Sequence, residues 1–113
     1  MKKRYRVRSN QDFQQLFSTG KHKASRNFVV YYGLRRMLTN DRVGISVGKK
    51  LGNAVERNRI KRQVRMMVSE ITDFSNGFDS VIIVRNHYKK CSYEDNKKEL
   101  LKLYESVYNN NVD

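Results

Sequence analysis

The sequence predicts a single α+β domain in which helices pack against a mixed β-sheet. Three observations predict this class. The length of 113 residues suits one modest core. Some segments space their apolar residues as helices do, and others space them as strands do. The sequence contains no proline, repeat or linker-like segment. The predicted order is a helix, two or three strands, a helix, a strand and a final helix.

The first predicted helix begins at Ser9. Residues 9–12 carry the side chains of a capping box, with Asp12 in place of the usual Glu or Gln. Phe13 and Phe17 share its apolar face, and Gly20 supplies a stop signal.

Strands are predicted after this helix. Residues 21–26 form a short strand or a loop, and residues 27–34, rich in Val, Tyr and Phe, form a strand. Alternation places four of its side chains on one face: Phe28, Val30, Tyr32 and Leu34. A hairpin connection over residues 35–41 leads to a strand over residues 42–48. One face of that strand carries Gly44, Ser46 and Gly48, which permit a helix or ligand to approach closely.

Residues 49–65 are the most informative segment, because they are dense in Lys and Arg and contain one acidic residue, Glu56. Asn53 can cap a helix that runs to about Thr72. At about 100° per residue, one arc of this helix is apolar and contains Ile60, Val64, Met67, Val68 and Ile71. The adjoining arc contains Arg57, Asn58, Lys61, Arg62 and Arg65. The helix therefore has a packing face beside a cationic face, on which like charges repel one another.

The remaining segments complete the sheet and its cover. Residues 75–77 form a turn, and the continuous apolar run within residues 79–85 predicts a strand covered on both faces. Ser92 and Asp95 form a capping box for a final helix, whose apolar side contains Leu100, Leu101, Leu103, Tyr104 and Val107. The strand–helix–strand unit over residues 42–85 is long enough for a parallel crossover, which is ordinarily right-handed.

The charge is uneven. The net charge is +13, but residues 1–65 hold 18 Lys and Arg against 3 Asp and Glu, a net of +15, and residues 66–113 have a net of −2. Such concentration of one sign indicates an anionic polymer or surface as partner. The chain has no apolar window near the ~20 residues of a membrane span, and the basic helix lacks Trp and Phe. Nucleic acid is therefore favoured over a membrane surface.

Catalysis by the protein itself has little support. His22 and His87 have no nucleophile or carboxylate pattern nearby in the sequence. Cys91, the only cysteine, excludes an internal disulfide and a multi-cysteine metal site, and it suits a reducing interior. The glycines and lysines over residues 44–50 do not have the spacing of a phosphate-binding loop. The aromatic side chains Phe13, Phe17 and Tyr32 either pack in the core or stack on unpaired bases.

Residues 49–65 closely resemble the signature of the bacterial ribonuclease P protein subunit, whose Arg-Asn-Arg core stands here at residues 57–59. The resemblance covers nearly the whole chain, including the basic start, the early Phe-x-x-x-Phe helix and the strands over residues 42–47 and 81–85. It implies an α/β sandwich with a four-stranded mixed sheet in the order helix–strand–strand–strand–helix–strand–helix. The resemblance alone implies a left-handed crossover.

The resemblance also implies a function, the removal of the 5′ leader from precursor tRNA in the cytoplasm. A catalytic RNA subunit performs the hydrolysis with Mg²⁺ that is bound mainly by RNA, and the protein alone has no active site and binds no metal. The partners implied are the RNA subunit and precursor tRNA, with neither membrane nor DNA. The family surface for the RNA subunit matches Lys49, Lys50, Asn53, Arg57, Asn58, Arg59, Lys61, Arg62 and Arg65. The leader-binding cleft matches Phe13, Phe17, Val30 and Tyr32.

Two other functions remain open from the residues. A general RNA-binding or ribosome-associated protein would use the same electrostatics without a catalytic RNA partner. A nuclease would use His22 or His87 as its base. The chain is expected to be one RNA-binding domain over residues 1–113, with flexible termini at 1–8 and 109–113.

Overall fold

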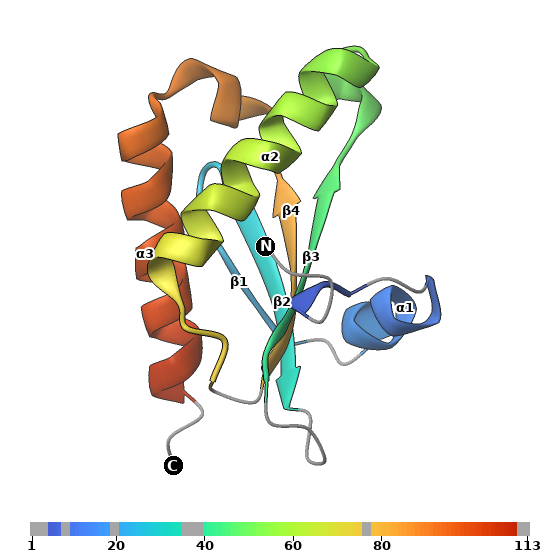
Figure 1. Cartoon of the computed structure of the whole chain (residues 1–113), viewed down its shortest axis with the longest axis vertical. Coiled ribbons are helices and arrows are strands. Elements are labelled where there is room, and N and C mark those ends of the chain that lie inside the picture. Colours follow the sequence, from blue (N-terminus) through green and yellow to red (C-terminus); the bar gives the residue numbers. More distant parts are fainter. Residues whose placement is uncertain (1–4, 8–9, 19–20, 35–39, 76–77, 111–113) are drawn as a thin grey trace.

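Helices cover both faces of one β-sheet in this computed structural model, which describes residues 5–7, 10–18, 21–34, 40–75 and 78–110 (Figure 1). The elements are α1 (Asn10–Ser18), β1 (His22–Ala24), β2 (Phe28–Leu34), β3 (Arg42–Val47), α2 (Ala54–Ile71), β4 (Phe78–Val84) and α3 (Tyr93–Asn110). Two short 3-10 turns precede α2 and α3, η2 (Lys49–Leu51) and η3 (Asn86–Lys90). The α+β class and the predicted element order are confirmed.

The sheet has the strand order β1-β2-β4-β3. Strand β2 pairs antiparallel with β1 and β4, whereas β3 pairs parallel with β4. The predicted hairpin between β2 and β3 is wrong, because β4 lies between these two strands. β4 is buried along nearly its whole length, as its continuous apolar run predicted. Residues 35–39 of the predicted hairpin connection lie outside the described residues.

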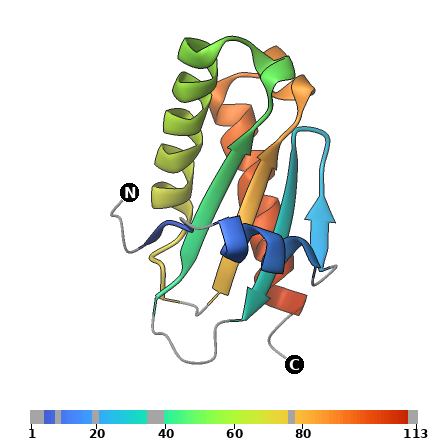
Figure 2. The ribbon, with the colours of Figure 1, turned by 90° about the vertical axis from the view of Figure 1, so that its right-hand side faces the viewer.

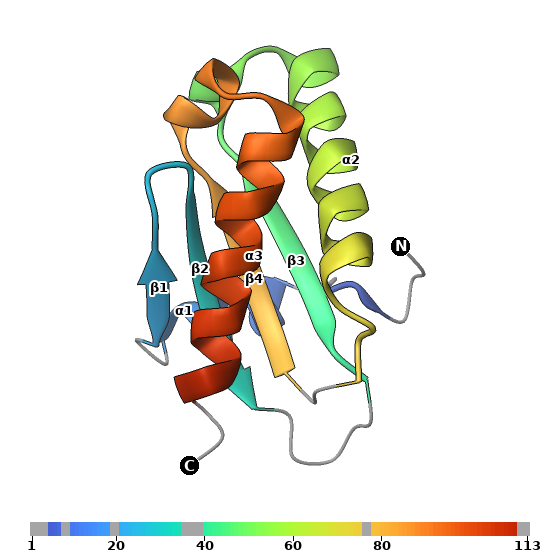
Figure 3. The same cartoon turned by 90° about the vertical axis from the view of Figure 1, so that its left-hand side faces the viewer.

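The crossover from β3 through α2 to β4 is left-handed. In Figure 3, α2 lies in front of the sheet, β3 and β4 both run upward, and β4 lies to the left of β3. A right-handed unit seen from this side would place the second strand to the right. The hand implied by the family resemblance is therefore confirmed, and the hand that general strand chirality favours is wrong.

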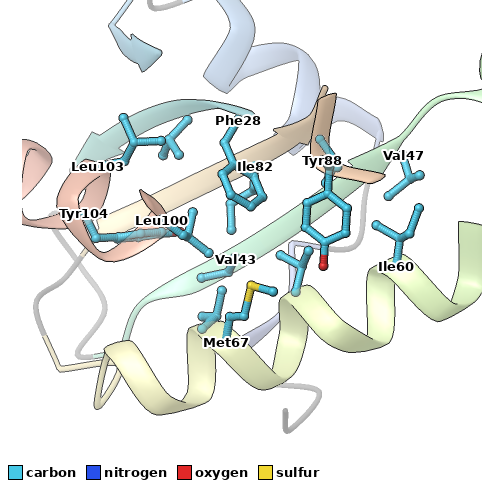
Figure 4. Packing of buried hydrophobic residues seen from close by; sticks show 14 of the residues in the cluster. Phe28, Val43, Val47, Ile60, Met67, Ile82, Tyr88, Leu100, Leu103 and Tyr104 are labelled. Atoms are coloured by element: carbon cyan, nitrogen blue, oxygen red, sulfur yellow. The ribbon is translucent and has the colours of Figure 1, made fainter. Parts of the chain in front are cut away.

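Helices α2 and α3 cover one face of the sheet and α1 covers the other (Figure 2). The larger core lies beneath α2 and α3, where side chains from both helices pack on the sheet (Figure 4). The predicted packing face of α2 is confirmed, since Ile60, Val64, Met67 and Val68 are buried. Leu101 was predicted on the apolar side of α3 but is exposed, because it lies about 100° around the helix from the buried Leu100.

Side-chain caps begin both long helices as predicted. Asn53 Oδ1 accepts the backbone N–H of Glu56 at 2.9 Å, and Ser92 Oγ accepts that of Asp95 at 3.1 Å. Gly52 has a φ of 135° and lies against Glu56, which only glycine tolerates. The predicted cap at Ser9, the stop at Gly20 and residues 76–77 of the predicted turn lie outside the described residues.

Part of the N-terminal segment contacts the sheet. Val7 N–H donates to the carbonyl of Val43 at 3.2 Å, and Tyr5 stacks on Phe74 with ring centroids 4.2 Å apart. Strand β3 therefore has β4 on one side and a short stretch of the N-terminal segment on the other. The flexibility predicted for residues 1–8 and 109–113 stays a prediction.

Gly44 lets α1 lie close to the sheet. A Cβ atom at this position would stand 2.7 Å from Cζ of Phe13 and 3.2 Å from Cβ of Val7. The close approach predicted for the small-residue face of β3 is thus made by α1. The absence of a side chain at Gly44 consequently leaves room for the ring of Phe13, the first aromatic residue of α1.

Gly44→Ala should lower the free energy of unfolding by about 1–3 kcal/mol, because the added methyl group would overlap the Phe13 ring and push α1 outward. Urea denaturation followed by circular dichroism measures this change. Gly48→Ala is the matched control, since among the described residues no atom beyond its two chain neighbours lies within 4 Å of its Cβ position. Its effect should stay within about 0.5 kcal/mol. Equal stability of the two variants would contradict the packing of α1 on Gly44.

Candidate nucleic-acid interface

The cationic face of α2 consists of Arg57, Lys61, Arg62 and Arg65, together with the exposed Asn58. Within the described part of the chain, no carboxylate lies within ion-pair distance of these four cations. The acidic residues of α2 form ion pairs on the opposite flank of the helix. Glu56 pairs with Lys89 at 3.0 Å, and Glu70 pairs with Lys97. The helix therefore presents positive charge that no acidic side chain in the described part of the chain neutralises.

Three arginines surround a hollow beside this face. Arg6, from the segment that pairs with β3, joins Arg62 and Arg65 around a volume of about 360 Å³. Burial lowers the pKa of Arg65 from its ordinary value, and the positive charge of Arg6 lowers it further. A phosphate placed here would offset both effects, because it supplies an opposite charge and hydrogen-bond acceptors for the guanidinium groups.

Arg57 has a buried hydrogen-bond donor without an acceptor among the described residues. Its Nε atom is buried, and no acceptor within the described residues bonds to it. A buried donor without a partner costs about 1–3 kcal/mol, and more for a charged group. Because the chain itself covers this atom, a bound partner could supply an acceptor only after the Arg57 side chain turned outward.

A groove of about 320 Å³ joins α1, β3 and α2. Its lining residues are Phe13, Gln14, Phe17, Ile45, Ser46, Val47 and Lys61. The rings of Phe13 and Phe17 are 6.4 Å apart, and Phe17 meets Tyr31 of β2 edge-on at 5.1 Å. Lys61 belongs both to this groove and to the cationic face. Aromatic side chains and a cation are therefore within reach of one extended ligand.

The structure corrects the predicted cleft at two positions. Val30 is fully buried and Tyr32 is 7% exposed, and both belong to the core under α2 and α3. They lie on the opposite face of β2 from Phe13 and Phe17, so their assignment to one cleft with these residues is wrong. Successive strand residues point to opposite faces, and the β2 residue that contacts Phe17 is Tyr31. The alternation visible in the sequence already separated Tyr31 from Tyr32.

The other predicted residues are placed apart from this groove. Lys49 and Lys50 are exposed in η2, between the end of β3 and α2. The side-chain oxygen of Asn53 is occupied by its capping bond. Arg59 lies on the other flank of α2, at a separate hollow of about 190 Å³ near Tyr88, Lys89 and Tyr93. The fold thus does not place Arg59 beside Arg57, although the two are close in sequence.

His87 lies near Cys91, a proximity that the sequence pattern did not show. Cys91 Sγ is 3.7 Å from His87 Nδ1, which also bonds to Asn27 Oδ1 at 2.7 Å. Asn27 donates its amide to Asn96 Oδ1 at 2.6 Å, so its oxygen faces the histidine. Because that oxygen only accepts, Nδ1 of His87 carries the proton and cannot take one from the thiol. This geometry argues against a cysteine–histidine nucleophile.

The described residues show neither a metal centre nor a membrane span. No three His, Cys, Asp or Glu side chains among them are grouped as ligands for a metal ion. Within the same residues, no helix has the length and apolar content that crossing a bilayer requires.

His22 is exposed in β1, and the centroid of its ring lies 5.1 Å from that of Tyr31.

Comparisons with known proteins point to one family. The family model described as Ribonuclease P matches residues 1–108. A ribonuclease P protein component of Bacillus cereus (strain B4264) is 46% identical over 105 residues, which cover 92% of this chain and 91% of the relative.

Solved structures agree with this match. A Staphylococcus aureus RNase P protein mutant with defective mRNA degradation activity gives a TM-score of 0.84 at 34% identity, and the match covers 93% of this chain and 89% of that one. The RNase P protein from Thermotoga maritima gives 0.74 at 31% identity, with 87% and 93% covered.

Neutralising the cationic face should flatten the salt dependence of RNA binding. For Lys61→Gln or Arg65→Gln, the slope of log K against log salt should fall by roughly 0.7–0.9, because each variant loses one phosphate contact and its released counterions. Filter binding or fluorescence anisotropy across a salt series measures the slope. Lys102→Gln, at an exposed site on α3, is the control and should leave the slope unchanged. An unaltered slope in the α2 variants would show that these groups do not neutralise phosphates.

Proposed function

Because this chain belongs to the ribonuclease P protein family, we propose that it binds the catalytic RNA subunit of ribonuclease P and the single-stranded 5′ leader of precursor tRNA. In this proposal, the cationic face of α2 lies against the RNA subunit, and the groove between α1, β3 and α2 holds the leader. The observation that carries the proposal is the lining of that groove, where Phe13 and Phe17 share one hollow with Lys61.

The cationic face supplies the contact with the RNA subunit. Arg offers a planar fork for two phosphate oxygens and Lys offers a compact charge, so both bind a phosphate backbone without reading its sequence. The absence of carboxylate partners among the described neighbours of these cations supports this role, because the charge is available to an anion. The arginine hollow beside the face, lined by Arg6, Arg62 and Arg65, has room for a phosphate.

The groove supplies the contact with the leader. Aromatic rings stack on unpaired bases at roughly 1–3 kcal/mol per base and tolerate any sequence, as a leader that differs between tRNAs requires. The partly buried rings of Phe13 and Phe17 suit this role, because both line the groove, and Lys61 lies where the groove meets α2. A leader in the groove would therefore run directly beside the RNA bound to α2.

The proposal divides the labour between the protein and the RNA subunit in a way that agrees with the side chains present. The described residues offer no carboxylate cluster for a metal ion, so no step is assigned to a metal held by them. Hydrolysis is proposed for the RNA subunit with Mg²⁺, in the cytoplasm. The protein would hold the leader in place and neutralise phosphates where the two RNAs meet.

Cleavage of precursor tRNA at low Mg²⁺ tests the proposal. The protein, a ribonuclease P RNA subunit and their mixture are assayed side by side, and only the mixture should release the leader efficiently. Cleavage by the protein alone would favour a nuclease with a histidine base. Binding of RNA without any stimulation of the RNA subunit would favour a general RNA-binding protein, the second candidate that the same charge distribution supports.

Phe17→Ala should weaken the binding of precursor tRNA to the reconstituted enzyme by roughly five- to a hundredfold, which corresponds to one lost stacked base. The binding of mature tRNA should change little, because mature tRNA has no leader. Tyr108→Ala is the control, since this half-buried aromatic residue packs on Phe78 on the α3 side of the molecule. Equal losses of affinity for precursor and mature tRNA in the Phe17 variant would contradict binding of the leader in the groove.

A further inference from the structure

The outer surface of α2 carries two exposed hydrophobic side chains. Among the described residues, three large hydrophobic side chains are exposed: Val55 at 78%, Met66 at 55% and Leu101 at 38%. The two most exposed both belong to α2, the helix with the densest positive charge. Neither side chain takes part in core packing, because the buried residues of α2 are Ile60, Val64, Met67 and Val68.

Val55 and Met66 lie on one line along the helix. They are eleven positions apart, which is close to three turns, so they stand about 20° apart around the helix and about 16 Å apart along it. Arg59 and Arg62 occupy the positions between them at helical spacing. These four residues, Val55, Arg59, Arg62 and Met66, form the outer ridge of α2.

The outer ridge points away from the sheet and adjoins the cationic face. Val64, at the centre of the packing face, is fully buried and lies about 180° around the helix from Val55. Met66 and Arg62 line the same hollow as Arg65, so the apolar end of the ridge borders the arginines. Any polyanion on the cationic face would pass within reach of Met66.

We propose that the outer ridge makes apolar contacts with ribose and base-edge surfaces of the RNA subunit, with Val55 and Met66 buried against the nucleic acid. This inference rests on the proposed function and deepens it, because it divides the α2 contact into two parts. The cationic face and the ridge arginines would bind phosphates, and Val55 and Met66 would bind the non-ionic surface between the phosphate strands. The minor groove of an RNA helix suits this contact, because it is wide and shallow and displays riboses and base edges.

Charge favours RNA over a second copy of the chain as the occupant. In a symmetric pairing through the ridge, Arg59 and Arg62 of one copy would face the same arginines of the other. The net charge of +13 adds general repulsion between copies. RNA instead places phosphates beside the arginines and less polar sugar surfaces beside Val55 and Met66.

The proposal has a signature that separates it from phosphate binding. Burial of an apolar side chain releases no counterions, so its contribution to affinity does not depend on salt. Val55→Thr and Met66→Gln keep the approximate size of each side chain at exposed helix positions. Each should weaken binding to a ribonuclease P RNA subunit by about three- to tenfold at every salt concentration. The slope of log K against log salt should remain that of the unmodified protein.

Leu101→Gln is the matched control, because it replaces an exposed hydrophobic residue on α3 and should leave RNA affinity unchanged. Thermal unfolding of all three variants checks that α2 remains folded. Unchanged affinity of the Val55 and Met66 variants, with normal binding by the unmodified protein, would overturn the inference alone. Failure of the unmodified protein to bind the RNA subunit would overturn the proposed function as well. Loss of self-association instead of RNA affinity would assign the ridge to a second copy and contradict the inference.

Oxidation of Met66 supplies a second readout without a variant. Hydrogen peroxide converts exposed methionine to its sulfoxide, and mass spectrometry locates the product. Met66 should oxidise readily in the free protein and severalfold more slowly in complex with the RNA subunit. Its neighbour Met67 is fully buried and should stay unmodified in both states. Equal oxidation of Met66 in the free and bound states would contradict burial of the ridge against RNA.

Discussion

The packing of the apolar stripe of α2 on the sheet is the interaction on which the rest of the surface depends. Each of its four buried side chains, Ile60, Val64, Met67 and Val68, contributes about 1.5–3 kcal/mol on burial. The repulsion among the cations of the same helix costs only a few tenths of a kcal/mol per pair. Packing therefore outweighs repulsion and sets the rotation of α2, so that uncompensated charge faces outward.

The left-handed crossover determines which elements lie beside the cationic face of α2. It places α2 over β3, which lies at the end of the strand order, while α1 lies on the other face of the sheet (Figure 2). The groove forms where α1, β3 and α2 meet, and it holds Phe17 and Lys61 together. Gly44 completes the arrangement because its missing side chain leaves room for the Phe13 ring. Stacking groups and phosphate-binding groups thus come from elements far apart in the sequence.

Local features could be predicted because they depend on nearby residues. The cap at Asn53, the packing face of α2 and the covered strand β4 follow from helical or strand periods. The strand order does not, since a hydrophobic pattern shows that a strand is covered but not which strand lies beside it. The hand of the crossover came from the family resemblance alone. Which face of β2 meets α1 depends on where α1 docks, so strand alternation alone could not show that Phe17 contacts Tyr31 and not Tyr32, the residue assigned through the resemblance.

Cross-linking to the leader tests most directly the claim that the groove beside α2 is a leader site. A photoreactive group is attached to a cysteine at position 14, through Gln14→Cys in a chain that also carries Cys91→Ser. Gln14 is exposed and lines the groove, and the same group at Lys102→Cys on α3 is the control. In the reconstituted enzyme, the account predicts cross-links to the precursor tRNA leader from position 14 and none from position 102. Leader cross-links from position 102 with none from position 14 would contradict it.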